Sequence, residues 1–209
     1  MINNVKVYGL EESIRRAKFP MSTKTENLTT ELTNGIANLA TAPRGSGHDN
    51  FLKGIVVQFD LTMTIKVWTE AERYHWFDFI SSQSTMHKIT KFDLDSAYIE
   101  YVDNRIINIM KEKVTAYNEL ANAMLPTDTS EEFRQEHKQA LSEKYLEILY
   151  SNPCGFKLTA GMTTNYQQLK TIYAQRKSHR LPEWRRFCAW IETLPHSEFI
   201  TGTRLQSDV

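Results

Sequence analysis

Apolar positions along this chain follow a strand-like pattern in a few short segments. Residues 5–10 alternate between apolar and polar side chains up to a glycine and leucine, and residues 55–61 form the most strand-like run of the sequence. Residues 158–162, which follow Pro153, are expected to be extended. These segments predict a small β-sheet.

Longer segments carry apolar residues three or four positions apart, the spacing of one helix face. The aromatic-rich residues 65–79 predict a buried helix. Residues 98–124 predict a long amphipathic helix, with one face made of Tyr98, Val102, Ile106, Ile109, Val114, Tyr117 and Leu120. The run Thr129-Ser130-Glu131-Glu132 matches a capping box and predicts a helix towards Ile148. Shorter helices are expected at residues 11–18, 31–41, 165–176 and 181–193, and a loop at residues 21–31.

The order of these elements favours one fold class. Strands and helices do not alternate as βαβ units, so the chain is expected to have an α+β fold, in which a small central antiparallel or mixed sheet packs against several long helices. The length of 209 residues suits one domain, which we place at residues 1–200. Residues 201–209 are expected to form a polar C-terminal tail.

The balance of charges argues against a polymer partner. Lys plus Arg and Asp plus Glu number 25 each, so nucleic acid is not expected as a ligand. One segment is nevertheless basic: residues 170–186 contain a single acid, Glu183, and the cations Lys170, Arg176, Lys177, Arg180, Arg185 and Arg186. Such a cluster predicts a site for a small anion.

Other features exclude several classes of protein. The cysteines Cys154 and Cys188 do not form a metal-type pair, and the six histidines are scattered, so no metal site is expected. The N-terminus is unlike a signal peptide, and no apolar run has the length of a membrane span. We therefore expect a cytoplasmic protein without membrane contact.

The segment 163–176 carries the most specific polar pattern. Asn165 and Arg176 are eleven positions apart, about three helical turns, and are expected on nearly one face. A carboxamide and a guanidinium together can bind a planar ring rich in carbonyl groups. A solvated surface helix remains the alternative.

Taken together, these segments resemble the flavin-dependent thymidylate synthase (ThyX) family over residues 5–191. The family's Asn-rich helix, ending in Leu-Arg and followed by a Gln-Trp-Glu helix, matches residues 165–176 and Glu183-Trp184-Arg185. Its glycine-His turn matches Gly47-His48, and its Arg-His-Arg signature falls on Arg73-Tyr74-His75. Three family arginines are replaced: the last of the Arg-His-Arg signature by His75, that of the Ser-x-Arg motif by Met86, and the one before Pro153 by Leu149.

The resemblance implies roles for individual residues. Arg176 would be catalytic, binding the carbonyls of a pyrimidine and stabilising the charge that develops on the ring. The residues implied in flavin binding are His48, Asn50, Arg73, His75, Asn165, Gln167, Thr171 and His179. Those implied in substrate binding are Glu70, Arg73, Gln83, Ser84, His87 and Arg176. Arg73 is expected among aromatic side chains, where its charge would need a partner.

The function implied is flavin-dependent one-carbon transfer to, or reductive modification of, a pyrimidine deoxynucleotide such as dUMP. FAD would be the cofactor, with NADPH and methylenetetrahydrofolate as co-substrates, and the protein would be a homotetramer. The replaced arginines leave open a catalytically degenerate homologue that binds a nucleotide as a sensor or assembly protein. A nucleic-acid-binding protein that uses the basic segment is a further alternative.

Overall fold

The computed structural model describes residues 1–202, so the predicted tail lies, from residue 203 on, outside the described residues. The chain divides into two compact units. The first, which we call the sheet unit, contains Met1–Met63, Val67–Ser81 and residues 159–202. The second, the helical unit, contains Thr64–Lys66 and Ser82–Leu158. A single domain over residues 1–200 stays a prediction, because two compact units can still unfold in one transition.

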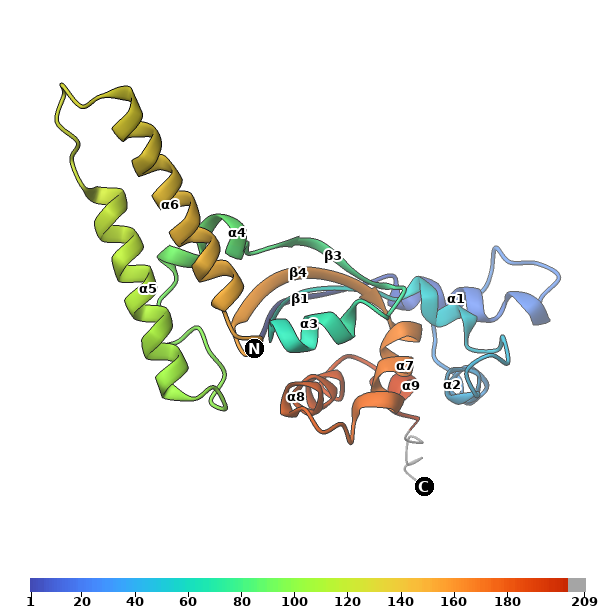
Figure 1. The fold of residues 1–209 in the computed structure, drawn as a ribbon. Helices are drawn as coiled ribbons and strands as arrows, with labels where there is room; N and C mark the ends of the chain where they lie inside the picture. Colours follow the sequence, from blue (N-terminus) through green and yellow to red (C-terminus); the bar gives the residue numbers. More distant parts are fainter. Residues whose placement is uncertain (203–209) are drawn as a thin grey trace. The chain divides into compact units, whose positions relative to one another are not determined.

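A four-stranded antiparallel sheet has the order β1-β2-β4-β3 (Figure 1). Its strands are β1 Ile2–Tyr8, β2 Val56–Thr64, β3 Phe77–Ser82 and β4 Lys157–Asn165. β1 and β2 are antiparallel, with Ile2 opposite Leu61 and Val7 opposite Val57. The predicted strands at residues 55–61 and 158–162 are confirmed, while the predicted strand at residues 5–10 begins earlier, at Ile2.

The prediction of one aromatic helix over residues 65–79 is wrong. Helix α3 covers only Ile65–Ala71; Tyr74 and Trp76 lie in the turn that follows, and Phe77 and Phe79 belong to the edge strand β3. Phe77 is buried on the inner face of the sheet, where its ring centroid lies 6.2 Å from that of Phe59. The aromatic spacing suits either structure, but α3 ends at Ala71 and Phe77–Ser82 pairs with β4 in the sheet.

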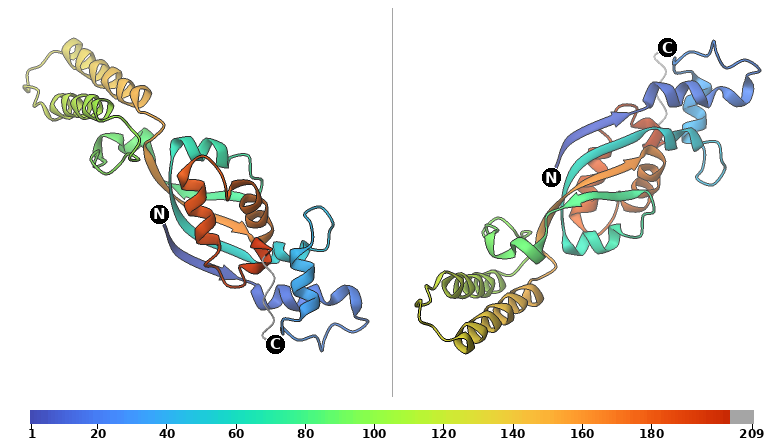
Figure 2. Two further views of the ribbon diagram at one scale, coloured as in Figure 1. Left: turned by 90° about the horizontal axis from the view of Figure 1, so that it is seen from below. Right: turned by 90° about the horizontal axis from the view of Figure 1, so that it is seen from above.

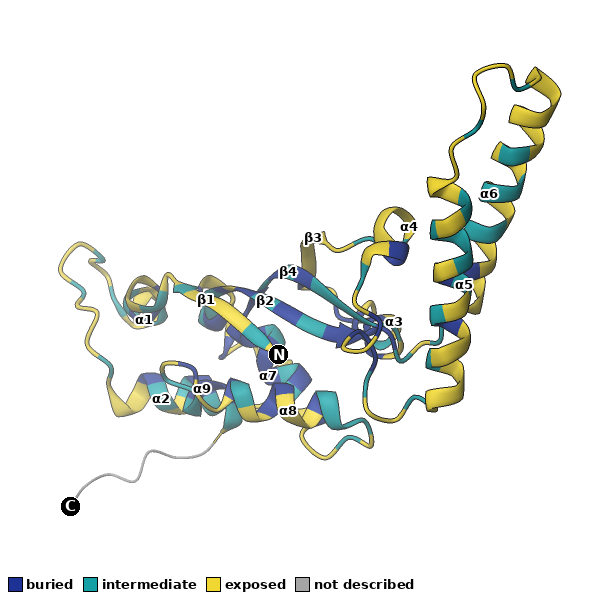
Figure 3. Cartoon of the chain, turned by 90° about the vertical axis from the view of Figure 1, so that its left-hand side faces the viewer, coloured by how far each residue is buried: buried dark blue, intermediate teal, exposed yellow. Residues whose placement is uncertain are grey.

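One face of the sheet carries the core of the sheet unit. Along β2, Val57 and Leu61 are buried while Val56 and Thr62 are only partly covered, which is the alternation of a strand with one buried face (Figure 3). Helices α7 Tyr166–Arg176 and α8 Pro182–Ile191 lie across the buried face, as the views from below and above show (Figure 2), and the short α9 Glu198–Thr201 packs against α7. Aromatic rings fill the interface, since the centroid of Phe59 lies 4.7 Å from that of Trp190 and 6.0 Å from that of Phe187.

The N-terminal part of the sheet unit contains α1 Leu10–Ala17, α2 Asn34–Thr41 and the short 3₁₀ turns η1 Phe19–Met21 and η2 Asn50–Gly54. Gly9 connects β1 to α1 with a φ of 73°, and a Cβ atom there would lie 2.5 Å from the Gly54 carbonyl oxygen. Only glycine therefore fits this turn without strain. Helix α2 starts later than the predicted residue 31, because Thr33 caps it by accepting from the Ile36 amide.

The helical unit consists of α4 Thr85–Lys88, the 3₁₀ turn η3 Ile89–Lys91, and the long helices α5 Asn104–Asn122 and α6 Glu131–Ser151. The predicted start of α5 at Tyr98 is wrong. Asp103 caps the helix by accepting from the Arg105 amide, and Tyr98 forms a β-bridge with Phe156 instead. The predicted cap of α6 is confirmed at Ser130, which accepts from the Phe133 amide.

A separate core holds the helical unit together. Its buried members are Ile89, Leu94, Ala97, Tyr98, Met110, Val114, Ile148 and Phe156. Ile106 and Ile109 were predicted on the buried face of α5 but are 41% and 49% exposed, since only the side of α5 that carries Met110 and Val114 faces this core. Among residues 1–202, no helix is both long enough and apolar enough to cross a bilayer.

Candidate functional site

Arg176, the last residue of α7, is held inside the sheet unit by two neighbours. The residue is only 6% exposed. Its Nε donates to the Tyr74 hydroxyl over 2.7 Å, and its Nη1 donates to Oε2 of Glu70 over 3.0 Å. The alternative of a solvated surface arginine is therefore wrong, because packing against α3 and the following turn removes Arg176 from water.

Aromatic rings enclose the same guanidinium. Its central carbon lies 4.9 Å from the ring centroid of Trp184 and 5.5 Å from that of Tyr74, within cation–π distance. The indole of Trp184 also donates to Oε2 of Glu70 over 3.1 Å. Glu70 therefore connects α3 to both α7 and α8. We call Glu70, Tyr74, Arg176, His179 and Trp184 the arginine cluster.

His179 completes the arginine cluster just after α7. Its Nε2 lies 2.8 Å from Nη1 of Arg176 and 3.7 Å from Oε2 of Glu70. Its Nδ1 faces the amide nitrogen of Leu181 over 3.2 Å. Glu70, Arg176 and His179 were predicted from sequence to belong to one site, and the fold brings all three together.

One edge of the Arg176 guanidinium is available to a ligand. Within residues 1–202, Nη2 of Arg176 donates no hydrogen bond, whereas Nε and Nη1 both do. Glu70 balances the positive charge, so the pair offers N–H donors without a net charge. This arrangement suits a neutral acceptor such as a ring carbonyl better than a phosphate, which needs uncompensated cations.

A second polar cluster, the aspartate cluster, forms around the fully buried Asp49. Nζ of Lys170 donates to Oδ2 of Asp49 over 3.1 Å and to the carbonyl oxygens of Ala40 and Ala42 over 2.6 and 2.5 Å. Nη1 of Arg44 donates to both Asp49 carboxylate oxygens, over 3.1 and 3.2 Å. Burial raises the pKa of Asp49, but the hydrogen bonds from Lys170 and Arg44 outweigh it and keep the pKa below its ordinary value.

Three predicted flavin-binding residues take part in the aspartate cluster. Gln167 is buried, and its Nε2 donates to Oδ1 of Asp49 over 3.1 Å and to Oδ1 of Asn50 over 3.2 Å. The Thr171 hydroxyl accepts from Nε of Arg44 over 3.1 Å. The side chains of Gln167 and Thr171 are therefore engaged with Asp49 and Arg44 inside this cluster, while Asn50 lies at the surface.

Asn165 differs from its predicted geometry. Its side chain accepts from the Gln168 amide over 2.9 Å, so Asn165 is the N-cap of α7 and not a residue of one of its faces. The idea of Asn165 and Arg176 on one helix face is therefore wrong.

The remaining predicted residues of the sheet unit are exposed: His48, Arg73 and His75. The expectation that Arg73 lies among aromatic side chains is wrong. Because α3 ends at Ala71, Arg73 belongs to the turn that follows and its charge is hydrated. His75 is not a core residue either, and its ring contacts that of Trp76.

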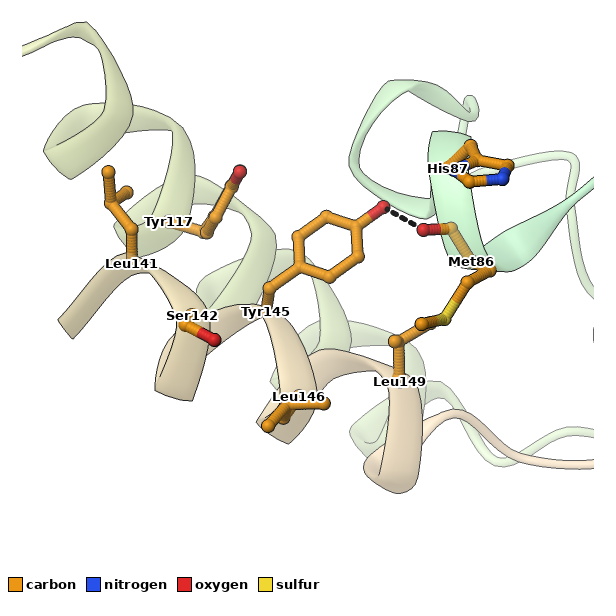
Figure 4. Close-up of a pocket in the computed structure, with 8 residues that line it drawn as sticks. All are labelled: Met86, His87, Tyr117, Leu141, Ser142, Tyr145, Leu146 and Leu149. Atoms are coloured by element: carbon orange, nitrogen blue, oxygen red, sulfur yellow. Dashed lines mark hydrogen bonds between the residues drawn. The ribbon is translucent and has the colours of Figure 1, made fainter. Parts of the chain in front are cut away.

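Gln83, Ser84 and His87 belong to the helical unit. There a groove of about 450 Å³ is lined by Met86, His87, Tyr117, Leu141, Ser142, Tyr145, Leu146 and Leu149 (Figure 4). Tyr145 donates to the Met86 carbonyl over 3.2 Å. Met86 and Leu149 stand where the resembled family has arginines, so His87 is the one lining side chain that can carry a positive charge.

The basic segment 170–186 does not form one surface. Lys170 and Arg176 are buried in ion pairs with Asp49 and Glu70. Nη1 of Arg185 donates to the carbonyls of His179 and Arg180 and so holds the loop between α7 and α8. The predicted anion site stays a prediction, and Lys170 and Arg176 do not belong to its surface because the fold turns them inward.

Sequence reasoning missed several members of these clusters as site residues. Tyr74 lies inside the Arg73-Tyr74-His75 triplet and Trp184 inside the matched tryptophan motif. Both motifs therefore pointed to these positions, but neither side chain was predicted to take part in the site. For Asp49 the sequence offered a weaker indication, an acidic residue in a glycine turn.

No group of three or more metal-binding side chains occurs among residues 1–202. Burial raises the pKa of the Cys188 thiol to about 11, which keeps it protonated at neutral pH.

Solved structures with the same fold cover nearly the whole chain. ThyX from Helicobacter pylori complexed with FAD and dUMP matches with a TM-score of 0.64 at 13% identity, over 94% of this chain and 96% of that one. The UMP/dUMP methylase PolB from Streptomyces cacaoi, bound with 5-Br dUMP, matches with a TM-score of 0.57 at 14% identity, over 97% and 94%. No family model and no curated protein sequence matches. The chain thus has the ThyX fold, with a strongly divergent sequence.

Proposed function

We propose that this protein is a flavin-dependent enzyme that modifies a pyrimidine deoxynucleotide such as dUMP, by one-carbon transfer or by reduction. The observation that carries the proposal is the arginine cluster. It stands at the end of α7 in a ThyX fold, where the resemblance to the ThyX family implies a base-binding arginine.

Arg176 binds the pyrimidine in this proposal. Nη2 donates to a ring carbonyl, while Glu70 and Tyr74 fix the other two nitrogens of the guanidinium. Because the side chain is buried and preorganised, it stabilises negative charge that develops on the ring without reorganising. Glu70 and Trp184 keep the guanidinium from turning away.

The residues of the sheet unit fit FAD in part. His48, Asn50, Arg73 and His75 present exposed hydrogen-bonding groups, which suit a diphosphate and flavin carbonyls. Gln167 and Thr171 instead contact the aspartate cluster and so support the turn that carries His48 and Asn50. FAD would supply the redox chemistry, and these residues would bind and orient it. NADPH and methylenetetrahydrofolate are the co-substrates that we propose with it.

We further propose a homotetramer in the cytoplasm. Large apolar side chains of the helical unit are exposed on and beside α5 and α6: Tyr101, Ile106, Ile109, Met124, Phe133, Leu146 and Tyr150. Exposed apolar surface of this kind is typical of subunit contacts. Light scattering tests the proposal, and a monomeric mass would contradict it.

A nucleotide-binding homologue without catalysis is the second candidate. The apolar groove favours it, since Met86 and Leu149 supply no cation where the resembled family has arginines. A protein of this kind would bind dUMP without turnover of any cofactor.

Titration with FAD distinguishes the two candidates. A flavoenzyme purifies yellow, or gains the flavin absorbance and a higher Tm when FAD is added, because ligands that bind only the native state stabilise it. The same measurement with dUMP tests nucleotide binding. A Tm unchanged by FAD but raised by dUMP supports the sensor, and a Tm unchanged by both contradicts both candidates.

A further inference from the structure

His179 lies between two hydrogen-bond donors. Nη1 of Arg176 faces its Nε2 over 2.8 Å, and the Leu181 amide faces its Nδ1 over 3.2 Å. A guanidinium and a backbone amide donate and never accept. A neutral imidazole has only one acceptor nitrogen, so only one of these contacts is a hydrogen bond in any one tautomer.

The contact with Arg176 is the stronger of the two. It is shorter, and its donor is charged, which makes such bonds about twice as strong as neutral ones. On this comparison we expect Nε2 of His179 to accept from Arg176 and the ring proton to lie on Nδ1.

We propose that His179 is a positioning residue for Arg176, and that protonation of its ring releases Arg176 and weakens ligand binding. The ligand named in the test rests on the proposed function. The neutral ring holds Nη1 from one side while Glu70 holds it from the other, so Nη2 points towards the ligand.

Protonation of His179 would disturb this arrangement. It would place Nε2–H against the Arg176 guanidinium, two positive charges at a contact of 2.8 Å. Glu70 on α3 is the carboxylate that faces this pair: its Oε2 accepts from Arg176 and Trp184 and lies 3.7 Å from Nε2 of His179, so a protonated ring would compete with Arg176 for it. The neighbouring elements also carry titratable or charged groups: Tyr74 after α3, Lys177 and Arg180 beside the ring, and Glu183, Arg185, Arg186 and Cys188 on α8. Imidazoles change charge between about pH 5 and 8.

Two substitutions separate the roles of the ring nitrogens. His179→Gln places a carbonyl oxygen near the position of Nε2, so it keeps an acceptor for Arg176 and cannot titrate. His179→Asn places its oxygen near the position of Nδ1, so it keeps the acceptor for Leu181 and loses the one for Arg176.

Calorimetric titration with dUMP at pH 8 and pH 5.5 reads out the difference. We expect wild type to lose at least about fivefold in affinity at pH 5.5 relative to His179→Gln, and His179→Asn to bind about tenfold more weakly than wild type at pH 8. The dUMP phosphate also titrates near pH 6. Because His179→Gln binds the same dUMP, the pH dependence of its affinity measures the contribution of the phosphate, which is subtracted from that of wild type. The same pH dependence in wild type and His179→Gln would overturn the proposal.

The ring itself can be observed without any ligand. Long-range ¹H–¹⁵N NMR of histidine-labelled protein shows which ring nitrogen is protonated, and the signal that disappears in His179→Gln assigns it. We expect Nδ1–H in wild type and Nε2–H in Arg176→Met. Nε2–H in wild type, or no change in Arg176→Met, overturns the proposal whatever dUMP does. The expected tautomers together with no dUMP binding would leave the role of His179 standing and contradict the proposed function.

Discussion

Lys170 on α7 and Asp49 in the turn before η2 form a buried ion pair, with Nζ and Oδ2 3.1 Å apart. The ammonium donates its other two hydrogen bonds to the carbonyls of Ala40 and Ala42, at the C-terminal end of α2. A cation is favoured there by the helix dipole. One side chain therefore joins α7, α2 and the turn that carries His48.

Removing this cation should destabilise the protein. We expect Lys170→Met to lower the free energy of unfolding by about 3 kcal/mol, because it leaves the Asp49 carboxylate buried with fewer partners. Urea unfolding measures the change. Lys177→Met, at an exposed position just after α7, is the matched control and should stay within about 0.5 kcal/mol of wild type. Equal effects of the two substitutions would contradict the structural role of the pair.

The same pair predicts how stability depends on pH. The pKa of Asp49 is lower in the folded protein than its ordinary value of 3.8, so the unfolded chain binds the proton more readily. The stabilisation by Asp49 is therefore complete well above pH 4 and is lost as pH falls through the lower folded pKa. We expect the stability difference between wild type and Asp49→Asn to be constant from pH 7 to about pH 5 and to shrink below about pH 4. A difference that grows towards acid pH would have the wrong sign.

The turn at Gly9 offers a test of the fold. Gly9→Ala should lower the free energy of unfolding by more than about 1 kcal/mol, because a positive φ and a contact with the Gly54 carbonyl both oppose a side chain. Gly45→Ala is the control, since Gly45 has a φ of 90° but nothing within 4 Å of the added Cβ. Thermal unfolding should show the larger loss for Gly9→Ala, and the reverse order would mean that the contact is relieved by a shift of the backbone.

Local patterns in the sequence were sufficient for most elements and failed where tertiary contacts decide. The strand at residues 55–61 and the cap at Ser130 follow from alternation and capping, which act within a few residues. The division between α3 and β3 depends on pairing with β4, some eighty positions further along the chain, and no local spacing contains that information.

The same distinction applies to the site. Arg176 and Glu70 were identified by their place in a motif, but their mutual ion pair was not, because it joins residues far apart in sequence. For the same reason no prediction was made for Asp49 from the sequence, and Lys170 was placed only in a cluster of cations. Their burial follows from how α2, η2 and α7 pack, and a single sequence shows charge without showing burial.

Substitution of Arg176 tests the proposed base-binding role most directly. If Nη2 donates to a pyrimidine carbonyl in a dry site, Arg176→Ala should weaken dUMP binding by about 2–3 kcal/mol, because charged hydrogen bonds are the costly ones to lose. Arg176→Lys should recover little of this, since an ammonium cannot reproduce the planar donors that contact Tyr74, Glu70 and the ligand at once.

The control for this measurement is Arg185→Ala. Arg185 is exposed and donates to loop carbonyls, so its loss should change dUMP affinity by less than about 1 kcal/mol. Calorimetry on the variants, with circular dichroism to confirm folding, compares the two positions. Equal weakening by both would indicate a diffuse basic surface. Unchanged binding by folded Arg176→Ala would show that Arg176 serves only its ion pair with Glu70, and that the ring is recognised elsewhere.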